Sequence, residues 1–234
     1  MSRLLSKVDR RTALGGLTAL ASAGLLALGL FTVVSALTDD DIPLPSEGSL
    51  QQIIGADAPA AGEPQAPPPT PAGPPPVRLV IARLYIDAPI ITLGLDARRY
   101  PEVPARPDQV AWYNFSAVPG QSSNAVFAGH VDWQTRAGDP IPGVFYRLRE
   151  LEIGDSIAVT LEDGAQVQYR VTGNVATAYN DPNVVKAMDT TTRDVITLIT
   201  CGGAWVPDPS EASGGNYSHR VIVRAERVAG FAGG

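Results

Sequence analysis

The sequence predicts an all-β domain over residues 77–234, in which seven or eight short strands form a single antiparallel barrel or sandwich. Short apolar or alternating runs recur along this region, and turns rich in Gly, Pro, Asn, Asp and Ser separate them. No run with the 3.6-residue period of a helix is long enough to predict a substantial helix. These observations favour strands joined by tight turns.

Each strand is predicted from its own residue pattern. The clearest is 166–178, where Val167, Tyr169 and Val171 alternate with polar side chains, as in a half-buried strand. The Asp163-Gly164 pair before it is typical of a hairpin turn. We expect strands at residues 77–86, 88–94, 110–113, 124–128, 156–161, 166–178, 195–201 and 219–228. We expect a turn at 119–123, short helical turns at 143–148 and 184–188, and a Gly-, Pro- and Ser-rich loop at 202–217.

Residues 12–37 are a run without any charged side chain, and a bilayer core needs about 20 apolar residues. Basic residues predominate in 1–11, whereas three aspartates follow the run at 39–41. This asymmetry predicts a cytoplasmic N-terminus at 1–11, a single-pass transmembrane anchor at 12–37, and everything beyond it outside the plasma membrane. The aspartates at 39–41 then either help to set the orientation of the anchor or are solvated residues where the chain leaves the membrane.

A cleaved signal peptide is the alternative for this run. The apolar region of such a peptide spans about 7–15 residues, and 12–37 is longer. Ala36-Leu37-Thr38 is also a poor cleavage site, and the residues after Arg10-Arg11 fit a twin-arginine export signal weakly. We therefore expect an uncleaved anchor.

Residues 38–76 hold more than half of the chain's 21 prolines and few large apolar side chains. Such composition favours extended polyproline II, so we expect a semi-rigid extracytoplasmic linker that rises about 3.1 Å per residue. The alternative use of these prolines is as a ligand for a proline-binding module. The globular domain is then 77–234.

The charge and cysteine content exclude several classes of function. The net charge is −6 in total, and because the first eleven residues carry +3, the remainder carries −9. An acidic exterior argues against binding nucleic acid or anionic lipid. The single cysteine cannot form an internal disulfide, so outside the cell it would pair between molecules or serve as a reactive thiol.

That cysteine, Cys201, ends the most β-branched run in the chain, 195–200, and Gly202-Gly203 follow it at once. The run predicts a buried strand, and the glycines allow a sharp turn. A thiol held at a strand end suits a nucleophile. A buried cysteine that packs as a small hydrophobic side chain is the other interpretation of this position alone.

A cysteine nucleophile needs a base or a cationic neighbour, because the thiolate is the reactive form. The chain has two histidines: His130 follows Gly129 at a predicted strand end, and His219 follows a polar stretch that suits a solvated side chain. Arg220 opens the last strand and could stabilise an oxyanion there, although an arginine at a strand entry is more often a surface charge.

These residues resemble the motifs of one family. Residues 197–201, Thr-Leu-Ile-Thr-Cys, match the Thr-Leu-x-Thr-Cys motif of sortases, the membrane-anchored cysteine transpeptidases of bacterial cell surfaces. Residues 128–130, Ala-Gly-His, resemble the family's catalytic-histidine segment, and 220–223, Arg-Val-Ile-Val, its arginine-led last strand. Residues 129–132, 143–148 and 202–203 look most like class F sortases. The resemblance extends over residues 77–228, and three motifs in order are more specific than one.

The resemblance implies a closed eight-stranded β-barrel and a Cys201–His130–Arg220 site. Cys201 would form a thioester acyl-enzyme, His130 would transfer protons, and Arg220 would hold the oxyanion, with Arg224 as a weaker alternative. Thr200 would contact substrate, unless it only fills the strand. The substrates would be surface proteins with a C-terminal Leu-Pro-x-Thr-Gly-type sorting signal, cut between Thr and Gly, and the acceptor would be an amine of a cell-wall precursor.

The resemblance implies no cofactor, and the sequence offers no acidic cluster that argues for a metal site. The catalytic domain would face the cell wall. Two alternatives differ in their chemistry: a thiol peptidase that only hydrolyses, and a non-catalytic stalked β-barrel that binds a surface ligand.

Overall fold

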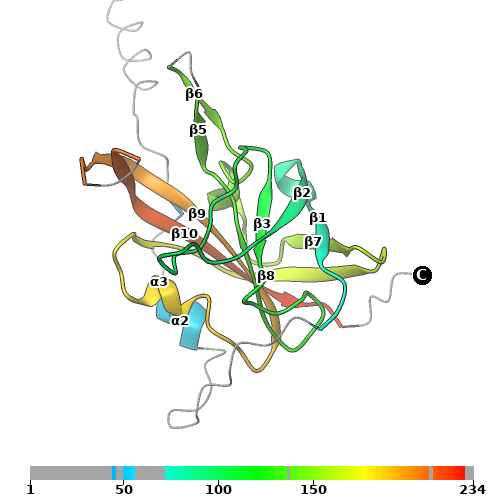
Figure 1. Ribbon diagram of the computed structural model, residues 1–234. Coiled ribbons are helices and arrows are strands. Elements are labelled where there is room, and N and C mark those ends of the chain that lie inside the picture. The colour runs from blue at the N-terminus through cyan, green and yellow to red at the C-terminus, as the bar shows by residue number, and fades with distance from the viewer. Residues whose placement is uncertain (1–43, 46–49, 56–71, 136–137, 211–212, 230–234) are drawn as a thin grey trace, which may run out of the picture. The chain divides into compact units, whose positions relative to one another are not determined.

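In a computed structural model the described residues are 44–45, 50–55, 72–135, 138–210 and 213–229. They form a closed barrel of eight strands in the order β1-β2-β3-β4-β9-β10-β8-β7, and a separate two-stranded sheet of β5 and β6 (Figure 1). The barrel strands are β1 (Pro76–Ile81), β2 (Ile86–Leu93), β3 (Val110–Tyr113), β4 (Ser123–Ala128), β7 (Ser156–Leu161), β8 (Gln166–Ala178), β9 (Asp194–Pro207) and β10 (Gly215–Arg227). The predicted all-β class and the closed eight-stranded barrel are confirmed.

The short elements are β5 (Asp132–Gln134), β6 (Pro140–Pro142), two α-helices, α2 (Leu50–Gly55) and α3 (Asn183–Lys186), and two 3₁₀ turns, η2 (Ala82–Leu84) and η3 (Leu148–Glu150). Among the described residues no helix is long and apolar enough to cross a membrane. The predicted anchor, 12–37, lies outside the described residues.

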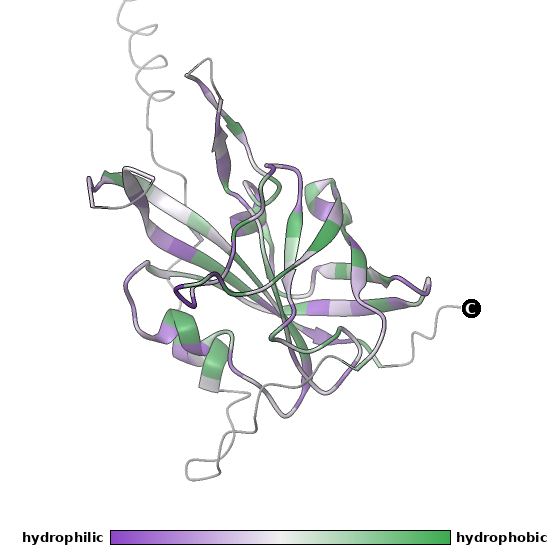
Figure 2. Cartoon of the chain, in the orientation of Figure 1, coloured by the Kyte–Doolittle hydropathy of each residue, from purple (hydrophilic) through white to green (hydrophobic). Residues whose placement is uncertain are grey.

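The barrel interior is filled by alternate side chains of its strands. Phe127 of β4, Leu198 of β9 and Tyr169 of β8 are fully buried there. Because successive strand residues point to opposite faces, the intervening residues form an outer face, where Ile199 and Ile222 pack under the two short helices. Figure 2 shows hydrophobic residues on both α2 and α3.

The prediction of a purely antiparallel sheet is wrong at two places. β2 pairs with β3 in parallel, and β4 pairs with β9 in parallel, while the other barrel pairs are antiparallel. Parallel neighbours need a long crossover connection, and the chain between β4 and β9 contains β5 to β8. Residue patterns along single strands do not reveal which strand lies beside which.

The predicted loop at 202–217 is also wrong over most of its length. β9 runs on to Pro207 and β10 already begins at Gly215. Beyond Gly202 these two strands pair only with each other among the described strands, and we call this extension, residues 203–207 with 215–218, the arm (Figure 1). Backbone pairing therefore outweighs the Gly- and Pro-rich composition that predicted a loop.

Other boundaries differ from prediction for local reasons. The expected strand 77–86 is divided by η2, because Tyr85 takes a left-handed φ of 57°. The β5–β6 hairpin was not predicted, since each strand has only three residues. The helical turn expected at 143–148 is a series of turns that leads into η3. The turn at Asp163-Gly164 and a helical turn near 184–188, seen as α3, are confirmed.

Part of the predicted linker lies against the barrel. Leu50 and Ile53 of α2 are buried in one cluster with Val175, Ala187 and Ile222. Gly173 of β8 permits this contact, because a Cβ there would lie 2.8 Å from the Ile53 side chain. The linker composition does not predict this helix, since its apolar residues are few and find partners only on the folded barrel.

Near Asp194, the first residue of β9, the side chain of Tyr169 on β8 connects three segments of the barrel wall. Its hydroxyl donates to Asp194 Oδ1 at 2.9 Å and accepts from the Gly120 N–H at 2.8 Å. Burial raises the pKa of Tyr169 well above its ordinary value, and raises the pKa of Asp194 as well. The phenol thus stays protonated and satisfies two partly buried groups.

We predict that Tyr169→Phe lowers the free energy of unfolding by about 1–3 kcal/mol, because the Gly120 N–H and Asp194 Oδ1 lose their partner. Thermal unfolding of the variant measures this. Tyr100→Phe is the matched control, since Tyr100 is largely exposed and should unfold like the parent. Equal melting temperatures for both variants would contradict the role given to the Tyr169 hydroxyl.

Candidate active site

Three adjacent strands, β4, β9 and β10, bring together the predicted residues His130, Cys201 and Arg220. Cys201 of β9 lies directly opposite Arg220 of β10 in the antiparallel ladder. On the other side, Ala128 at the end of β4 is level with Ile199 of β9. His130, two residues further on, is therefore expected at the level of Cys201. Cys201 thus has Arg220 opposite it on one neighbouring strand, and the other neighbouring strand leads into His130.

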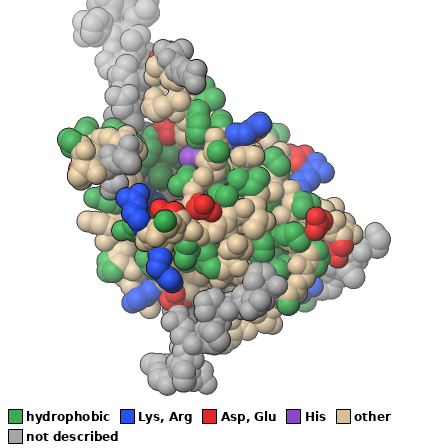
Figure 3. Space-filling view, in the orientation of Figure 1, with side chains coloured by type: hydrophobic (Ala, Val, Ile, Leu, Met, Phe, Trp, Pro, Cys, Tyr) green, Lys and Arg blue, Asp and Glu red, His purple; other side chains and the backbone are tan. Residues whose placement is uncertain are grey.

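All three positions belong to the outer face of the barrel. Cys201 shares its face with Ile199, and Arg220 shares its face with Ile222, because residues two apart on a strand point the same way. The described basic and acidic side chains on the side shown in Figure 3 lie interspersed. No single sign of charge dominates that side of the described residues.

A hydrogen bond fixes the tautomer of His130. Its Nε2 lies 2.7 Å from the carbonyl oxygen of Pro104, and a carbonyl can only accept, so Nε2 carries the proton. The ring also packs edge-on against Trp133, with centroids 4.9 Å apart. Nδ1 is then the ring nitrogen that can accept a proton from a reacting group.

The chain around His130 is packed tightly by two glycines. A Cβ at Gly129 would lie 2.6 Å from the Val144 side chain, and one at Gly143 would lie 2.3 Å from the His130 carbonyl oxygen. The absence of both allows Phe145 to donate its N–H to that carbonyl at 2.9 Å. The segment 143–148 thus packs against the backbone of His130 and holds it in place.

Cys201 is half-buried and free of any disulfide. Burial raises the pKa of its thiol, the charge of Arg220 lowers it, and the charge of Asp132 raises it. The net direction is upward, so the resting cysteine is a neutral thiol. Attack by this sulfur requires a base, and His130 follows β4, the strand that pairs with β9.

Arg220 is held by four groups. Its guanidinium donates to Asn216 Oδ1 at 2.8 Å and to the carbonyl oxygens of His219 at 2.9 Å and Tyr217 at 3.3 Å. The ring of Tyr179 lies 5.8 Å from its central carbon. Neutral acceptors leave the positive charge uncompensated, which suits a group that must stabilise a developing oxyanion.

Thr200 faces the opposite way from Cys201. Its side chain is buried, and its hydroxyl donates to the carbonyl oxygen of Gly129 at 2.8 Å. This bond ties the nucleophile strand to the segment that carries His130. The hydroxyl is thus used within the protein, and the contact to substrate expected from the sequence stays a prediction.

The two weaker candidates lie elsewhere. His219 is opposite Gly202, on the other face of β10 from Arg220, and its Nδ1 lies 2.8 Å from the Ser218 hydroxyl. Arg224 is buried opposite Thr197 and donates to the Ala187 carbonyl oxygen at 3.4 Å. Arg224 therefore lies beneath the α3 segment, four residues along β10 from Arg220.

Two residues that the sequence did not single out also act on the site. Tyr217 of the arm donates its hydroxyl to Asp132 Oδ2, which connects the arm to the β5–β6 hairpin. Asp132 influences the Cys201 thiol through its charge. The available signal was proximity in sequence, because Asp132 follows His130 by two residues.

Among the described residues, no three or more His, Cys, Asp or Glu side chains gather as metal ligands would. A free cysteine opposite an oriented guanidinium, beside a strand that leads into an oriented histidine, is typical of a cysteine-dependent acyl-transfer site.

The comparisons agree with this class. The sortase domain model matches residues 79–228, and the chain belongs to the sortase family. It is accordingly a cysteine transpeptidase. A search of curated protein sequences finds no match.

Solved structures similar to this chain include three sortases. Sortase C-1 of Actinomyces oris is 26% identical, over 65% of this chain and 72% of that one, with a TM-score of 0.44. A lid mutant of sortase A from Corynebacterium diphtheriae is 23% identical, over 76% and 89%, with a TM-score of 0.47. A sortase D5 transpeptidase of Clostridium perfringens is 20% identical, over 66% and 79%, with a TM-score of 0.45.

The Thr200 bond gives the first prediction for the site. We expect Thr200→Val to slow Cys201-dependent peptide cleavage about five- to tenfold, because the lost hydrogen bond, worth about 1 kcal/mol, no longer holds the His130 segment in register. Thr200→Ser keeps the hydroxyl and should retain most of the activity. Equal rates for the two variants, with equal melting temperatures, would contradict this positioning role.

The charges around Cys201 predict a pH dependence. The wild-type rate of alkylation by iodoacetamide should rise with a midpoint above the ordinary pKa of a thiol. Arg220→Ala removes the charge that favours the thiolate, so its midpoint should move further upward and its rate at neutral pH should fall. Arg220→Lys keeps a positive charge and should lie between the two. A downward shift in Arg220→Ala would show that this charge does not act on the thiol.

Proposed function

We propose that this sortase is anchored in the plasma membrane by residues 12–37, with its catalytic domain on the cell-wall face. The asymmetry of charge around that run supports the proposal. The segments 129–132, 143–148 and 202–203 support an assignment to class F. The substrates are surface proteins that carry a Leu-Pro-x-Thr-Gly-type sorting signal.

The observation that carries the mechanism is the register of β9, which sets Cys201 opposite Arg220 and beside the His130 segment. In the first half-reaction the Sγ of Cys201 attacks the carbonyl carbon between Thr and Gly, and the thiol proton passes to His130 Nδ1. Arg220 stabilises the oxyanion. His130 then protonates the departing glycine amine, the C–N bond breaks, and a thioester remains on Cys201.

In the second half-reaction an amine of a cell-wall precursor attacks the thioester. His130 accepts a proton from that amine, the C–S bond breaks, and the proton returns to the sulfur. The raised pKa of Cys201 helps at this step, because a protonated sulfur no longer attacks the new amide carbonyl. The product is a surface protein joined to the precursor by a new amide bond.

We predict a trapped acyl-enzyme as the direct test. The domain should gain the mass of the cleaved peptide at Cys201 when it is incubated with a panel of sorting-signal peptides, and Cys201→Ala should gain none. Ser210→Ala, on the exposed turn after β9, is a control that should acylate normally. Absence of any adduct across the panel would refute the proposed substrate class.

The identity of the product separates transfer from hydrolysis. With an amine present, the released peptide should carry that amine at its new C-terminus. If only the free acid forms at all amine concentrations, the protein is a hydrolytic thiol peptidase. If Cys201 resists alkylation in the folded state and Cys201→Ala has no effect on surface attachment, a non-catalytic binding role replaces both.

A further inference from the structure

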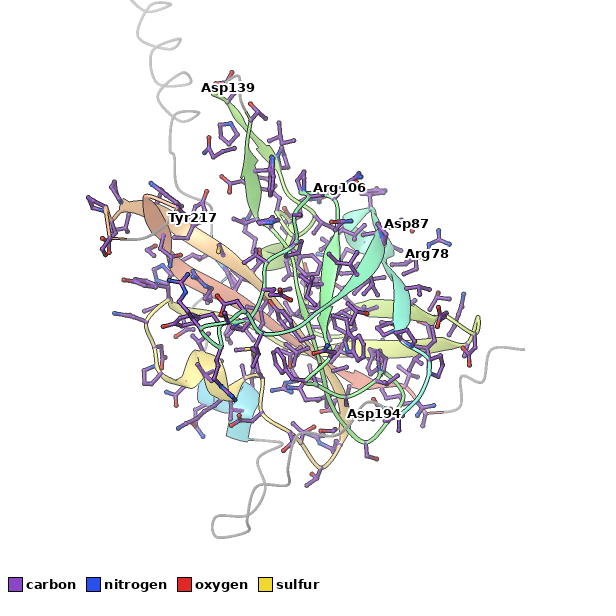
Figure 4. All side chains as sticks on the ribbon, viewed as in Figure 1. Arg78, Asp87, Arg106, Asp139, Asp194 and Tyr217 are labelled. Atoms are coloured by element: carbon purple, nitrogen blue, oxygen red, sulfur yellow. The ribbon has the colours of Figure 1, made fainter. Side chains whose placement is uncertain are left out.

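Asp132 is a half-buried carboxylate at the site whose charge has no assigned purpose. It begins β5, two residues after His130, and its Oδ2 accepts a hydrogen bond from the hydroxyl of Tyr217. Tyr217 in turn packs edge-on against Trp205, with ring centroids 5.3 Å apart. Figure 4 shows Tyr217 on the arm, and Asp139 at the far tip of the hairpin that Asp132 opens. The carboxylate is thus held from one side only.

The other oxygen, Oδ1, is left open. No described residue donates a hydrogen bond to it, and no described Lys or Arg forms an ion pair with Asp132. Some acidic side chains of the barrel differ, as Asp87 and Asp194 do in pairing with Arg78 and Arg227. Asp132 therefore keeps its negative charge without an ion pair among the described residues, and Oδ1 can accept a hydrogen bond from a cation.

The carboxylate does not help the first half-reaction. Burial raises the pKa of Cys201, and the charge of Asp132 adds to this effect, against the charge of Arg220. A negative group beside the nucleophile disfavours the thiolate that attacks the signal peptide. A benefit must therefore come at another step. The second half-reaction brings in an amine, which is a cation in neutral solution.

We propose that Asp132 is the binding site for the ammonium group of the acceptor, with Oδ1 accepting one of its N–H bonds. This rests on the proposed transpeptidation. The ammonium would be held at Asp132, close in sequence to His130 and within reach of the acyl group on Cys201. The bound ammonium first gives one proton to solvent. The neutral nitrogen then attacks the thioester carbonyl carbon while His130 Nδ1 removes a second proton, and the C–S bond breaks. The proton on His130 then passes to the sulfur.

The positive and the negative group of the site therefore have different roles. Arg220, held by neutral acceptors, faces the oxyanion of the acyl group, whereas Asp132, held by a neutral phenol, faces the cation that arrives later. Tyr217 positions the carboxylate without neutralising it. A primary amine on a flexible chain, such as a lysine side chain or a peptide amino end, has the chemistry that this carboxylate would recognise.

Asp132→Asn tests the assignment, because the amide keeps an oxygen for Tyr217 and loses the charge. Two acceptors are compared at neutral pH: Nα-acetyl-lysine amide, which is a cation, and hydroxylamine, which is neutral. We expect the apparent KM for the lysine amide to rise about tenfold, the loss of one ion pair at a half-buried site. The KM for hydroxylamine should change less than about twofold, and acylation by the signal peptide should become faster.

Asp139→Asn is the matched control, because Asp139 lies exposed on the same hairpin and its removal changes the net charge equally. It should leave both acceptors unaffected. Equal losses with the lysine amide and hydroxylamine would overturn the assignment, since Asp132 would then act by supporting the protonated His130. If the parent domain uses neither acceptor although it forms the acyl-enzyme, the proposed transpeptidation fails, and this assignment with it.

Discussion

The pairing of β9 with both of its neighbours is the constraint on which the active site depends. Its antiparallel ladder with β10 sets Cys201 opposite Arg220, and its parallel ladder with β4 brings up the segment of His130. A slip of one residue in either ladder would turn the partner side chain to the interior. The buried side chains of Phe127 and Leu198 prevent that slip, since it would expose them. Core packing and catalysis therefore depend on the same register.

The strand patterns and the nucleophile were predictable because they depend on short-range sequence. The β-branched run before Cys201 is a strand whatever its neighbours are, and a lone cysteine at its end stands out. The parallel β4–β9 pairing was not predictable, because it joins segments about 70 residues apart. The arm was missed for a related reason: its glycines and prolines predict a loop, and only the mutual pairing of β9 and β10 makes it a ribbon.

The inward orientation of Thr200 follows from the same alternation and was within reach of the sequence. If Cys201 is exposed to substrate, its neighbour on the strand must point into the barrel. Asp132 was equally visible by its spacing from His130. What the sequence lacked was the partner, because Tyr217 lies 85 residues along the chain from Asp132. Contacts between two projecting ribbons leave no periodic signal in either one.

The raised pKa of Cys201 fits an enzyme that works outside the cell, as proposed here. Oxidants react with the thiolate far faster than with the thiol, so a neutral, half-buried Cys201 is less open to oxidation than a thiolate would be. A permanently ionised cysteine would react faster but would also be lost sooner. The site meets both requirements, low reactivity at rest and reactivity with substrate, through different groups. Asp132 and burial raise the pKa of Cys201 and so keep the sulfur protonated at rest. Arg220 and the proton-accepting Nδ1 of His130 lower the barrier only when a carbonyl is bound beside them.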